Sequence, residues 1–193
     1  MLPGDGQLSI PARPSAFADP VNQRSDPMVD YEVGGVALFD PNQGLQVKLW
    51  TLRSDGHAVT VEAEGAPAVV LFTRSGTITR VGLAFDQAMN PHVAFVEDGL
   101  VWLWWRDTLA NAMVFTSFPG ARSPCLSLDE KRSEELSKSD VLFSYLRADA
   151  LCVRQQRDRY AIEEIKATGV TLDLISTGRA VGGRFQWMLQ TPE

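Results

Sequence analysis

The stretch AFDQAMNPHVAFVEDGLVWLWWRDTLANAMVFTS, residues 84–117, contains two apolar runs joined by Asp98-Gly99 and a third run after them. An Asp-Gly pair between apolar runs is the strongest short-range signal of a β-hairpin, because a two-residue type I′ turn needs positive φ at both central positions. We therefore predict paired antiparallel strands at His92–Glu97 and Leu100–Trp105, followed by a third strand at Ala112–Ser117.

The second strand of this hairpin has no polar face. Its side chains alternate between two apolar sets, with Leu100, Trp102 and Trp104 on one side and Val101, Leu103 and Trp105 on the other. Because neighbouring side chains of a strand point to opposite faces, we expect both faces to be buried. The indole rings suit a core or a subunit contact, and they also suit a platform that stacks on sugar rings. Trp102, Trp104 and Trp105 are therefore candidate interface residues.

Short strands continue on both sides of the hairpin. The pattern predicts them at 36–39, 45–52, 57–63, 68–73 and 77–85, and again at 140–147, 151–160, 161–167, 170–175 and 184–189. Turn residues such as Ser54-Asp55-Gly56 separate runs that are rich in Val, Thr, Leu and aromatic residues. This arrangement is typical of an antiparallel all-β domain. We expect loops at 118–124 and 127–140, although the charged residues of the second could also form a short helix.

A weak internal repeat is present within this meander of short strands. HVAFVEDGLVWLWWRD (His92–Asp107) and DVLFSYLRADALCVRQQRD (Asp140–Asp158) share a Val-x-Phe strand, a tight turn, a longer strand and a final Arg-Asp. Their spacing is close to the ~40–50 residues of a four-stranded propeller blade. Propellers close with about four to eight blades, and this chain has room for about three. It is therefore a β-sandwich or a set of partial β-propeller-like blades, or its subunits complete one another's sheets.

Residues 1–30 differ from the all-β domain predicted at 31–193. The segment contains five prolines and only scattered apolar side chains: Pro3, Pro11, Pro14, Pro20 and Pro27. Such a segment cannot bury enough apolar surface to fold alone. We expect an extended N-terminal arm that lies along another subunit, with a disordered tail as the alternative.

Charge and hydropathy exclude several classes of partner. The formal net charge is −6 and the pI is near 5.0, which argues against a nucleic-acid coat protein and a polybasic membrane binder. No run approaches the roughly 18 apolar residues of a membrane-spanning helix. The start, MLPGDGQLSIPARP, lacks the pattern of a signal peptide. We expect a soluble protein, made in the cytoplasm, with no membrane insertion and no sequence-specific nucleic acid.

Residues of the types found in metal sites and catalytic sites are few and scattered. Cys125, Cys152, His57 and His92 do not have the spacing of a metal site, and we expect both cysteines to be free thiols. No nucleophile elbow, phosphate-binding loop or zinc-protease motif is present, and no two carboxylates stand out as a pair for glycoside hydrolysis. The sequence therefore favours a non-enzymatic protein without a cofactor.

Arginines gather near the second copy of the repeat. On the predicted strand 151–160, Arg157 and Arg159 alternate onto one face and Arg154 onto the other. Charged groups on both faces are typical of salt-bridged contacts between sheets or subunits, so Arg154, Arg157 and Arg159 are further candidate interface residues. A solvated face and a contact with phosphates are the alternatives.

Three pieces of the chain carry a family likeness: AFDQAMNPHVAFV, LDEKR and YLRADALCVRQQRDRY. Residues 81–189, which contain them, resemble virion structural proteins of tailed bacteriophages. The resemblance implies a multimeric component of the tail or neck, such as an adaptor, hub or nozzle-like protein. Its partners would be copies of itself and other virion proteins, its location would be the virion, and no catalytic residues are implied. The alternative function is a carbohydrate- or receptor-binding β module that uses exposed tryptophans to bind a glycan or host receptor.

Overall fold

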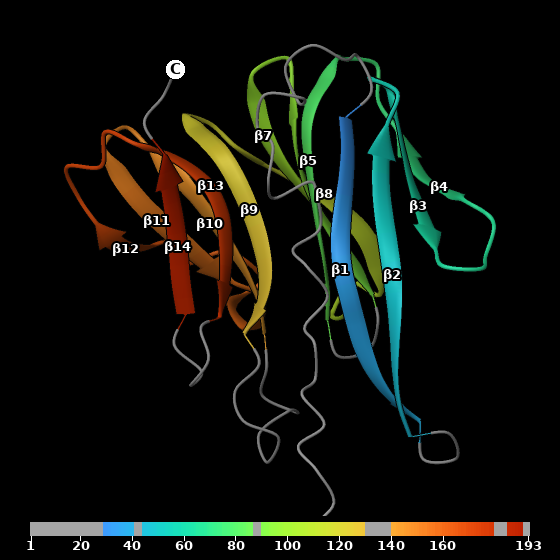
Figure 1. Ribbon diagram of the computed structural model, residues 1–193. Helices are drawn as coiled ribbons and strands as arrows, with labels where there is room; N and C mark the ends of the chain where they lie inside the picture. Colours follow the sequence, from blue (N-terminus) through green and yellow to red (C-terminus); the bar gives the residue numbers. More distant parts are fainter. Residues whose placement is uncertain (1–28, 41–43, 87–89, 130–139, 180–184, 191–193) are drawn as a thin grey trace, which may run out of the picture.

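The computed structural model describes residues 29–40, 44–86, 90–129, 140–179 and 185–190, and within these it confirms an all-β fold (Figure 1). The expected arm lies almost entirely outside the described residues. The strands are β1 (Val29–Asp40), β2 (Gly44–Ser54), β3 (Ala58–Ala63), β4 (Val69–Thr73), β5 (Ile78–Phe85), β6 (Pro91–Glu97), β7 (Leu100–Asp107), β8 (Ala112–Phe118), β9 (Ala121–Asp129), β10 (Asp140–Arg147), β11 (Ala150–Gln155), β12 (Glu164–Ala167), β13 (Asp173–Arg179) and β14 (Phe185–Gln190).

The strands form four antiparallel sheets in chain order. Sheet A contains β1 to β4, sheet B contains β5 to β8, sheet C contains β9 to β12, and sheet D contains β13 and β14. In sheets A, B and C every strand pairs with the next one along the chain. This is the predicted meander, interrupted each time that the chain starts a new sheet.

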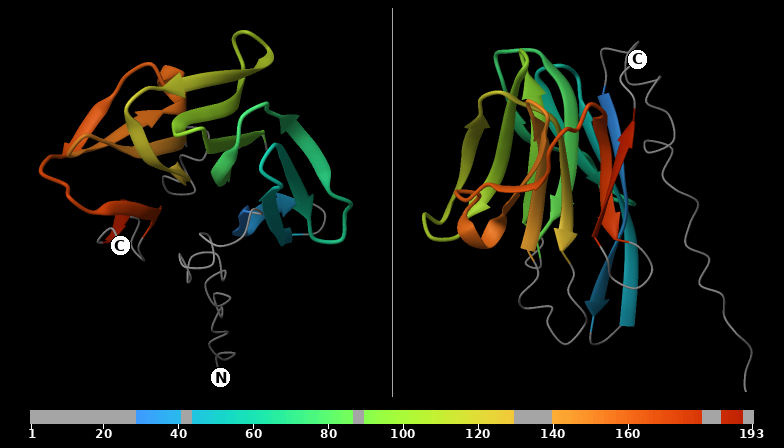
Figure 2. Two further views of the ribbon diagram at one scale, coloured as in Figure 1. Left: turned by 90° about the horizontal axis from the view of Figure 1, so that it is seen from above. Right: turned by 90° about the vertical axis from the view of Figure 1, so that its left-hand side faces the viewer.

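The sheets pack side by side as an arc (Figure 2, left). The first strands of successive sheets are in contact, β1 with β5, β5 with β9, and β9 with β13. These inner strands line the inside of the arc, and β4, β8, β12 and β14, which we call the outer strands, are the last strands of their sheets. The arrangement is therefore a set of partial propeller blades rather than a sandwich of two sheets.

The deciding hairpin forms as predicted. Asp98 and Gly99 join β6 to β7 with φ of 49° and 79°, which are the values that a type I′ turn requires. The second copy of the repeat forms β10 and β11, so both copies supply the second and third strands of their sheets. The repeat in the sequence thus corresponds to a repeat in the structure.

Apolar cores fill the spaces between neighbouring sheets. One lies between sheets A and B and includes Leu52, Val59, Phe95 and Trp104. Another lies between sheets B and C and includes Leu103, Trp105, Phe143 and Tyr160. A smaller one lies between sheets C and D and includes Cys125, Leu146, Leu151 and Leu174. Each interior sheet is therefore buried on both faces, as the double apolar face of β7 predicts.

The loop predicted at 118–124 is reduced to a turn at 119–120, and the start of the one predicted at 127–140 is strand, while residues 130–139 lie outside the described residues. β9 runs through this region and is the inner strand of sheet C. Pro124 obscures the strand in the sequence because proline cannot donate a hydrogen bond to a neighbouring strand. Here β9 pairs on one side alone, and its register shifts near Pro124, opposite Ser144 and Leu146. An edge strand with a bulge is where a proline can be accommodated.

Two further strand predictions are corrected. The strand predicted at 151–160 ends at Gln155, and a 3-10 turn, η3 (Gln156–Asp158), follows it. Arg159 and Tyr160 then take positive φ of 52° and 57°, which cannot continue a strand. The predicted placement of Arg157 and Arg159 on one face of this strand is therefore wrong, because both residues lie beyond its end. β12 begins at Glu164 and not at 161.

Candidate functional site

The tryptophans of β7 lie in the cores between sheets. Trp104 is 7% exposed and Trp105 is 4% exposed. Trp102 is half-buried, its ring is stacked with Phe95, and the Arg74 guanidinium lies 4.5 Å from its centroid. In the part of the chain whose side chains are described, no two indole rings are exposed side by side, so the platform that the carbohydrate alternative requires is not seen there.

Arg154 binds groups of its own chain. Its Nε donates to the Tyr145 hydroxyl at 2.8 Å, and Nη1 donates to the carbonyl oxygens of Tyr160 and Ala161 at 2.7 Å each. The Tyr145 hydroxyl also donates to Glu163, which lies 3.3 Å from Arg154 Nη2. Burial and the bond to Glu163 raise the pKa of Tyr145 to about 12. Arg154 therefore holds the segment after β11 against sheet C.

The other two candidate arginines are apart from Arg154. Arg159 forms an ion pair with Asp107 at the end of β7, and so joins sheet C to sheet B. Asp107 also accepts bonds from the backbone N–H groups of Leu109 and Ala110. Burial opposes the ionisation of Asp107, but the bonds from Arg159 and the backbone outweigh it and lower its pKa. Arg157 is exposed on η3. The three arginines do not form one surface.

A buried polar network that the sequence did not predict connects sheets B and C. The Tyr160 hydroxyl and His92 Nδ1 form a hydrogen bond of 2.8 Å, and these residues are 1% and 0% exposed. His92 Nε2 lies 3.7 Å from the Asp86 carboxylate, which also accepts bonds from Asn90 and from Gln156 Nε2. Burial would raise the pKa of Asp86, but His92 and the two amides outweigh it and hold that pKa well below its ordinary value.

This network has the composition of a catalytic triad but not the access. A hydroxyl, an imidazole and a carboxylate are in line, yet the hydroxyl and the imidazole are sealed beneath Trp105, whose ring contacts both Tyr160 and His92. Neither group is exposed to solvent in the described part of the chain. The Tyr160–His92 and Gln156–Asp86 hydrogen bonds connect the two sheets, whereas His92 Nε2, 3.7 Å from the Asp86 carboxylate, makes no hydrogen bond.

A second polar cluster joins sheets A and B. Arg74, which follows β4, donates to Glu97 at 2.9 and 2.6 Å, and Glu97 also accepts the N–H of Gly76 at 3.0 Å. Asp98 in the type I′ turn accepts the N–H of Thr77 at 3.0 Å. The β6–β7 hairpin thus holds in place the connection between β4 and β5.

Exposed apolar side chains mark a different part of the surface. Where side chains are described, the large apolar residues that are exposed and lie on strands all lie on outer strands: Val69, Val70, Met113, Phe115, Ile165 and Met188. Val69 and Val70 of β4 are 55% and 57% exposed. Phe115 of β8 is 39% exposed, and its ring lies 5.3 Å from that of Phe72 in β4. The outer strands of sheets A and B therefore meet through Phe72 and Phe115, and each carries exposed apolar side chains, although Val70, which pairs with Thr60, lies on the far face of sheet A.

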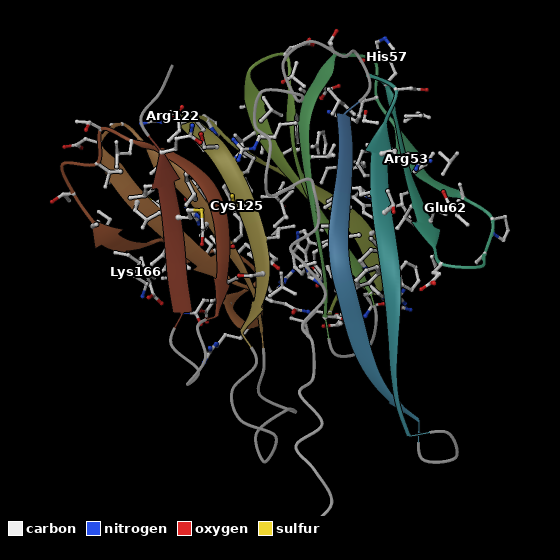
Figure 3. The ribbon with its side chains drawn as sticks, viewed as in Figure 1. Arg53, His57, Glu62, Arg122, Cys125 and Lys166 are labelled. Carbon is white, nitrogen blue, oxygen red and sulfur yellow. The ribbon has the colours of Figure 1, made fainter. Side chains whose placement is uncertain are left out.

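The far face of sheet A is polar by contrast. Thr51, Arg53, Thr60 and Glu62 alternate with the buried residues of β2 and β3. Arg53 and Glu62 form an exposed ion pair at 3.5 Å (Figure 3). A polar face of this kind suits solvent and does not suit packing against another sheet.

The described residues give little evidence of a metal site, a reactive thiol or a membrane-spanning helix. No group of three or more potential metal ligands occurs there. Cys125 on β9 and Cys152 on β11 are buried free thiols, and burial raises the pKa of each (Figure 3 shows Cys125). The described part of the chain has no helix with the length and apolar character needed to cross a bilayer. Comparison with family models, curated proteins and solved structures gives no match to this chain.

Proposed function

We propose that this protein is a non-enzymatic structural component of a tailed-phage virion, and that it forms a multimer in the tail or neck through the outer strands of its sheets. The observation that supports assembly is the contact between the outer strands β4 and β8, on which Val69, Met113 and Phe115 are exposed. The resemblance of residues 81–189 to virion proteins supplies the setting.

The chemistry of the outer strands supports contacts at sheet edges. The sequences of β4, VVLFT, and β8, AMVFTSF, contain no charge and no proline. Soluble proteins commonly protect a free edge with charged residues or proline, because an unprotected edge pairs with other chains. Two neighbouring edges without protection are expected where copies of a protein meet.

The assembly is tested by the mass of the purified protein in solution, measured by light scattering. We expect a multimer for the full chain and a shift toward monomer for the double variant Val69→Lys/Phe115→Lys, because a desolvated lysine opposes the contact. The matched control is Thr168→Lys/Thr171→Lys, which adds the same charge at exposed positions between β12 and β13, outside the two outer strands β4 and β8. A full chain that stays monomeric at all concentrations would contradict assembly through these strands.

The virion setting needs a separate measurement. Particles purified from cells that produce this chain should contain it in several copies each, as counted by quantitative mass spectrometry. Its absence from such particles would contradict the virion assignment, whatever the oligomeric state in solution.

A further inference from the structure

An apolar strip along β4, β8 and the β7–β8 turn is formed by four exposed side chains: Val69, Leu109, Met113 and Phe115. The ring of Phe72 in β4 lies 5.3 Å from that of Phe115 in β8. Arg74, two residues later, lies 4.5 Å from the ring of Trp102, whose partner on β8 is Ser117. The two strands therefore run side by side in the same direction, and the residues that precede Phe72 lie beside those that precede Phe115.

The strand residues of the strip face the space between sheets A and B. Val69 pairs with Val61, which belongs to the core between these sheets. Phe115 pairs with Trp104 of the same core, and Met113 lies two residues before it. Residues two apart on a strand share a face, so all three exposed side chains lie at the rim of that core. An apolar rim built by two sheets is typical of a site where another protein binds.

The β7–β8 turn extends the strip and is held by its own side chains. Leu109 in this turn is 79% exposed. Asp107 accepts the backbone N–H groups of Leu109 and Ala110. Asn111, with a φ of 50°, accepts a hydrogen bond from Arg106 at 2.7 Å. Because these bonds order the turn before a partner arrives, a contact through Leu109 costs little conformational entropy.

Side chains of opposite charge flank this end of the strip. Arg106 pairs with Met113 across β7 and β8, so it lies on the sheet B side. Glu64 is exposed in the turn between β3 and β4, on the sheet A side. That turn precedes Val69, so Glu64 lies at the same end of the strip as Leu109. The surface is apolar along its length, with an acid on one side and a base on the other.

We propose that a second copy of the chain binds this strip, related to the first by a two-fold axis parallel to β4 and β8. The inference rests on the proposed assembly through these strands and specifies how two copies meet. Such an axis places the sheet A side of one copy on the sheet B side of the other. Leu109 then contacts the partner's Val69, and Arg106 faces the partner's Glu64. Each contact occurs twice, as a self-complementary surface requires.

Reversal and rescue of charge test the axis. Light scattering over a dilution series measures the dissociation constant of the multimer. Glu64→Arg and Arg106→Glu should each raise it about tenfold, because like charges then meet twice. The Asn111 amide can donate to a carboxylate at 106, so the turn keeps a side-chain bond. The double variant Glu64→Arg/Arg106→Glu should return to within about threefold of the original chain. A double variant as weak as the weaker single variant would overturn the proposal.

A cross-link between copies tests which residues meet and leaves the strip intact. The ¹⁵N-labelled variant Ala110→Cys is mixed with the unlabelled variant Ala68→Cys, and a short bifunctional maleimide is added. Both positions are exposed beside members of the strip, and Cys125 and Cys152 are buried and stay in place. The control mixture replaces Ala68→Cys with Thr168→Cys, at an exposed position between β12 and β13.

We expect labelled and unlabelled chains to be joined through residues 110 and 68 at about ten times the yield of the control mixture, because the two-fold contact holds these thiols together. Equal yields in the two mixtures would overturn the two-fold arrangement.

A matched pair of variants separates this inference from the proposed assembly. Leu109→Asp should raise the dissociation constant about tenfold or more, because it places a charge in an apolar contact. Ile165→Asp, the control, makes the same change at an exposed residue of β12 in sheet C and should leave the constant unchanged. A full chain that stays monomeric would contradict both the assembly and the two-fold contact. A multimer that Leu109→Asp weakens no more than Ile165→Asp does would contradict the two-fold contact alone.

Discussion

Replacing Gly76 with alanine should destabilise the fold through one defined clash. Gly76 lies in the connection between β4 and β5, and a Cβ atom there would lie 2.2 Å from Asp98 Oδ2 and 2.6 Å from Glu97 Cγ. Both distances are far inside van der Waals contact. The alanine can be accommodated only if these two carboxylate side chains move.

Moving them breaks interactions that hold sheets A and B together. Glu97, whose side chain is 8% exposed, would be drawn away from Arg74 and from the N–H of residue 76. Loss of hydrogen bonds to a buried charged group costs about 1–3 kcal/mol. Forcing an extra methyl group into a packed site costs about 1–3 kcal/mol more. We therefore expect Gly76→Ala to lower the free energy of unfolding by about 2–6 kcal/mol.

Urea unfolding, followed by tryptophan fluorescence, measures this free energy. Gly82→Ala is the matched control, because the nearest atom to its Cβ would be the carbonyl oxygen of Ala94 at 4.0 Å, an ordinary contact. That variant should range from unchanged to about 1 kcal/mol more stable. If Gly76→Ala stays within about 0.5 kcal/mol of the original chain, the reasoning is refuted, because the clash then has no energetic consequence.

Three further predictions concern buried groups. Because the pKa of Asp86 is lowered by folding, its ionisation stabilises the fold above about pH 4, and this contribution is lost as the pH falls toward the folded pKa. The free energy of unfolding of Asp86→Asn, measured with urea, should thus be about 1–3 kcal/mol lower at pH 7 and should depend less on pH below about 4. A pH profile equal to that of the original chain would contradict this. Because folding raises the pKa of Tyr145 to about 12, its protonated form stabilises the fold below about pH 10, and this contribution is lost as the pH rises from about 10 through about 12. Ultraviolet titration should lose this late step in Tyr145→Phe, and a step that remains would assign it to another tyrosine. Trp105→Ala should cost about 3–5 kcal/mol in urea unfolding and the half-buried Trp102→Ala less; equal losses would show that the ring of Trp102 is as tightly packed as that of Trp105.

Local pattern predicted most of the strands and the deciding turn. Asp98-Gly99 needs positive φ whatever surrounds it, and alternation of apolar residues places β6, β7 and β8 without knowledge of their partners. Where local pattern conflicted with packing, prediction failed. β9 contains Pro124, so the sequence pattern predicts a loop there. The proline is acceptable because β9 lies at a sheet edge, and that position is decided by the tertiary structure.

The roles of the polar residues depended on contacts between distant segments. Arg154 looked like an interface residue because its strand was polar on both faces, but its partners Tyr145 and Glu163 become neighbours only when the chain turns back after η3. Asp86 directly follows β5 of sheet B and Gln156 begins η3 after β11 of sheet C, and no local pattern relates them. Networks of this kind cannot be predicted from residue spacing along the chain, because the partner of each side chain lies in a distant segment.

The sequence by itself determined that this protein is an antiparallel all-β chain with a repeated hairpin, because turn chemistry and side-chain alternation act within a few residues. Only the tertiary structure decided that the repeats are sheets packed in an arc, that Trp104 and Trp105 are core residues, and that the exposed large apolar side chains of the described strands lie on outer strands. These properties depend on which face of each sheet meets a neighbour, and that is settled by packing between segments far apart in the chain.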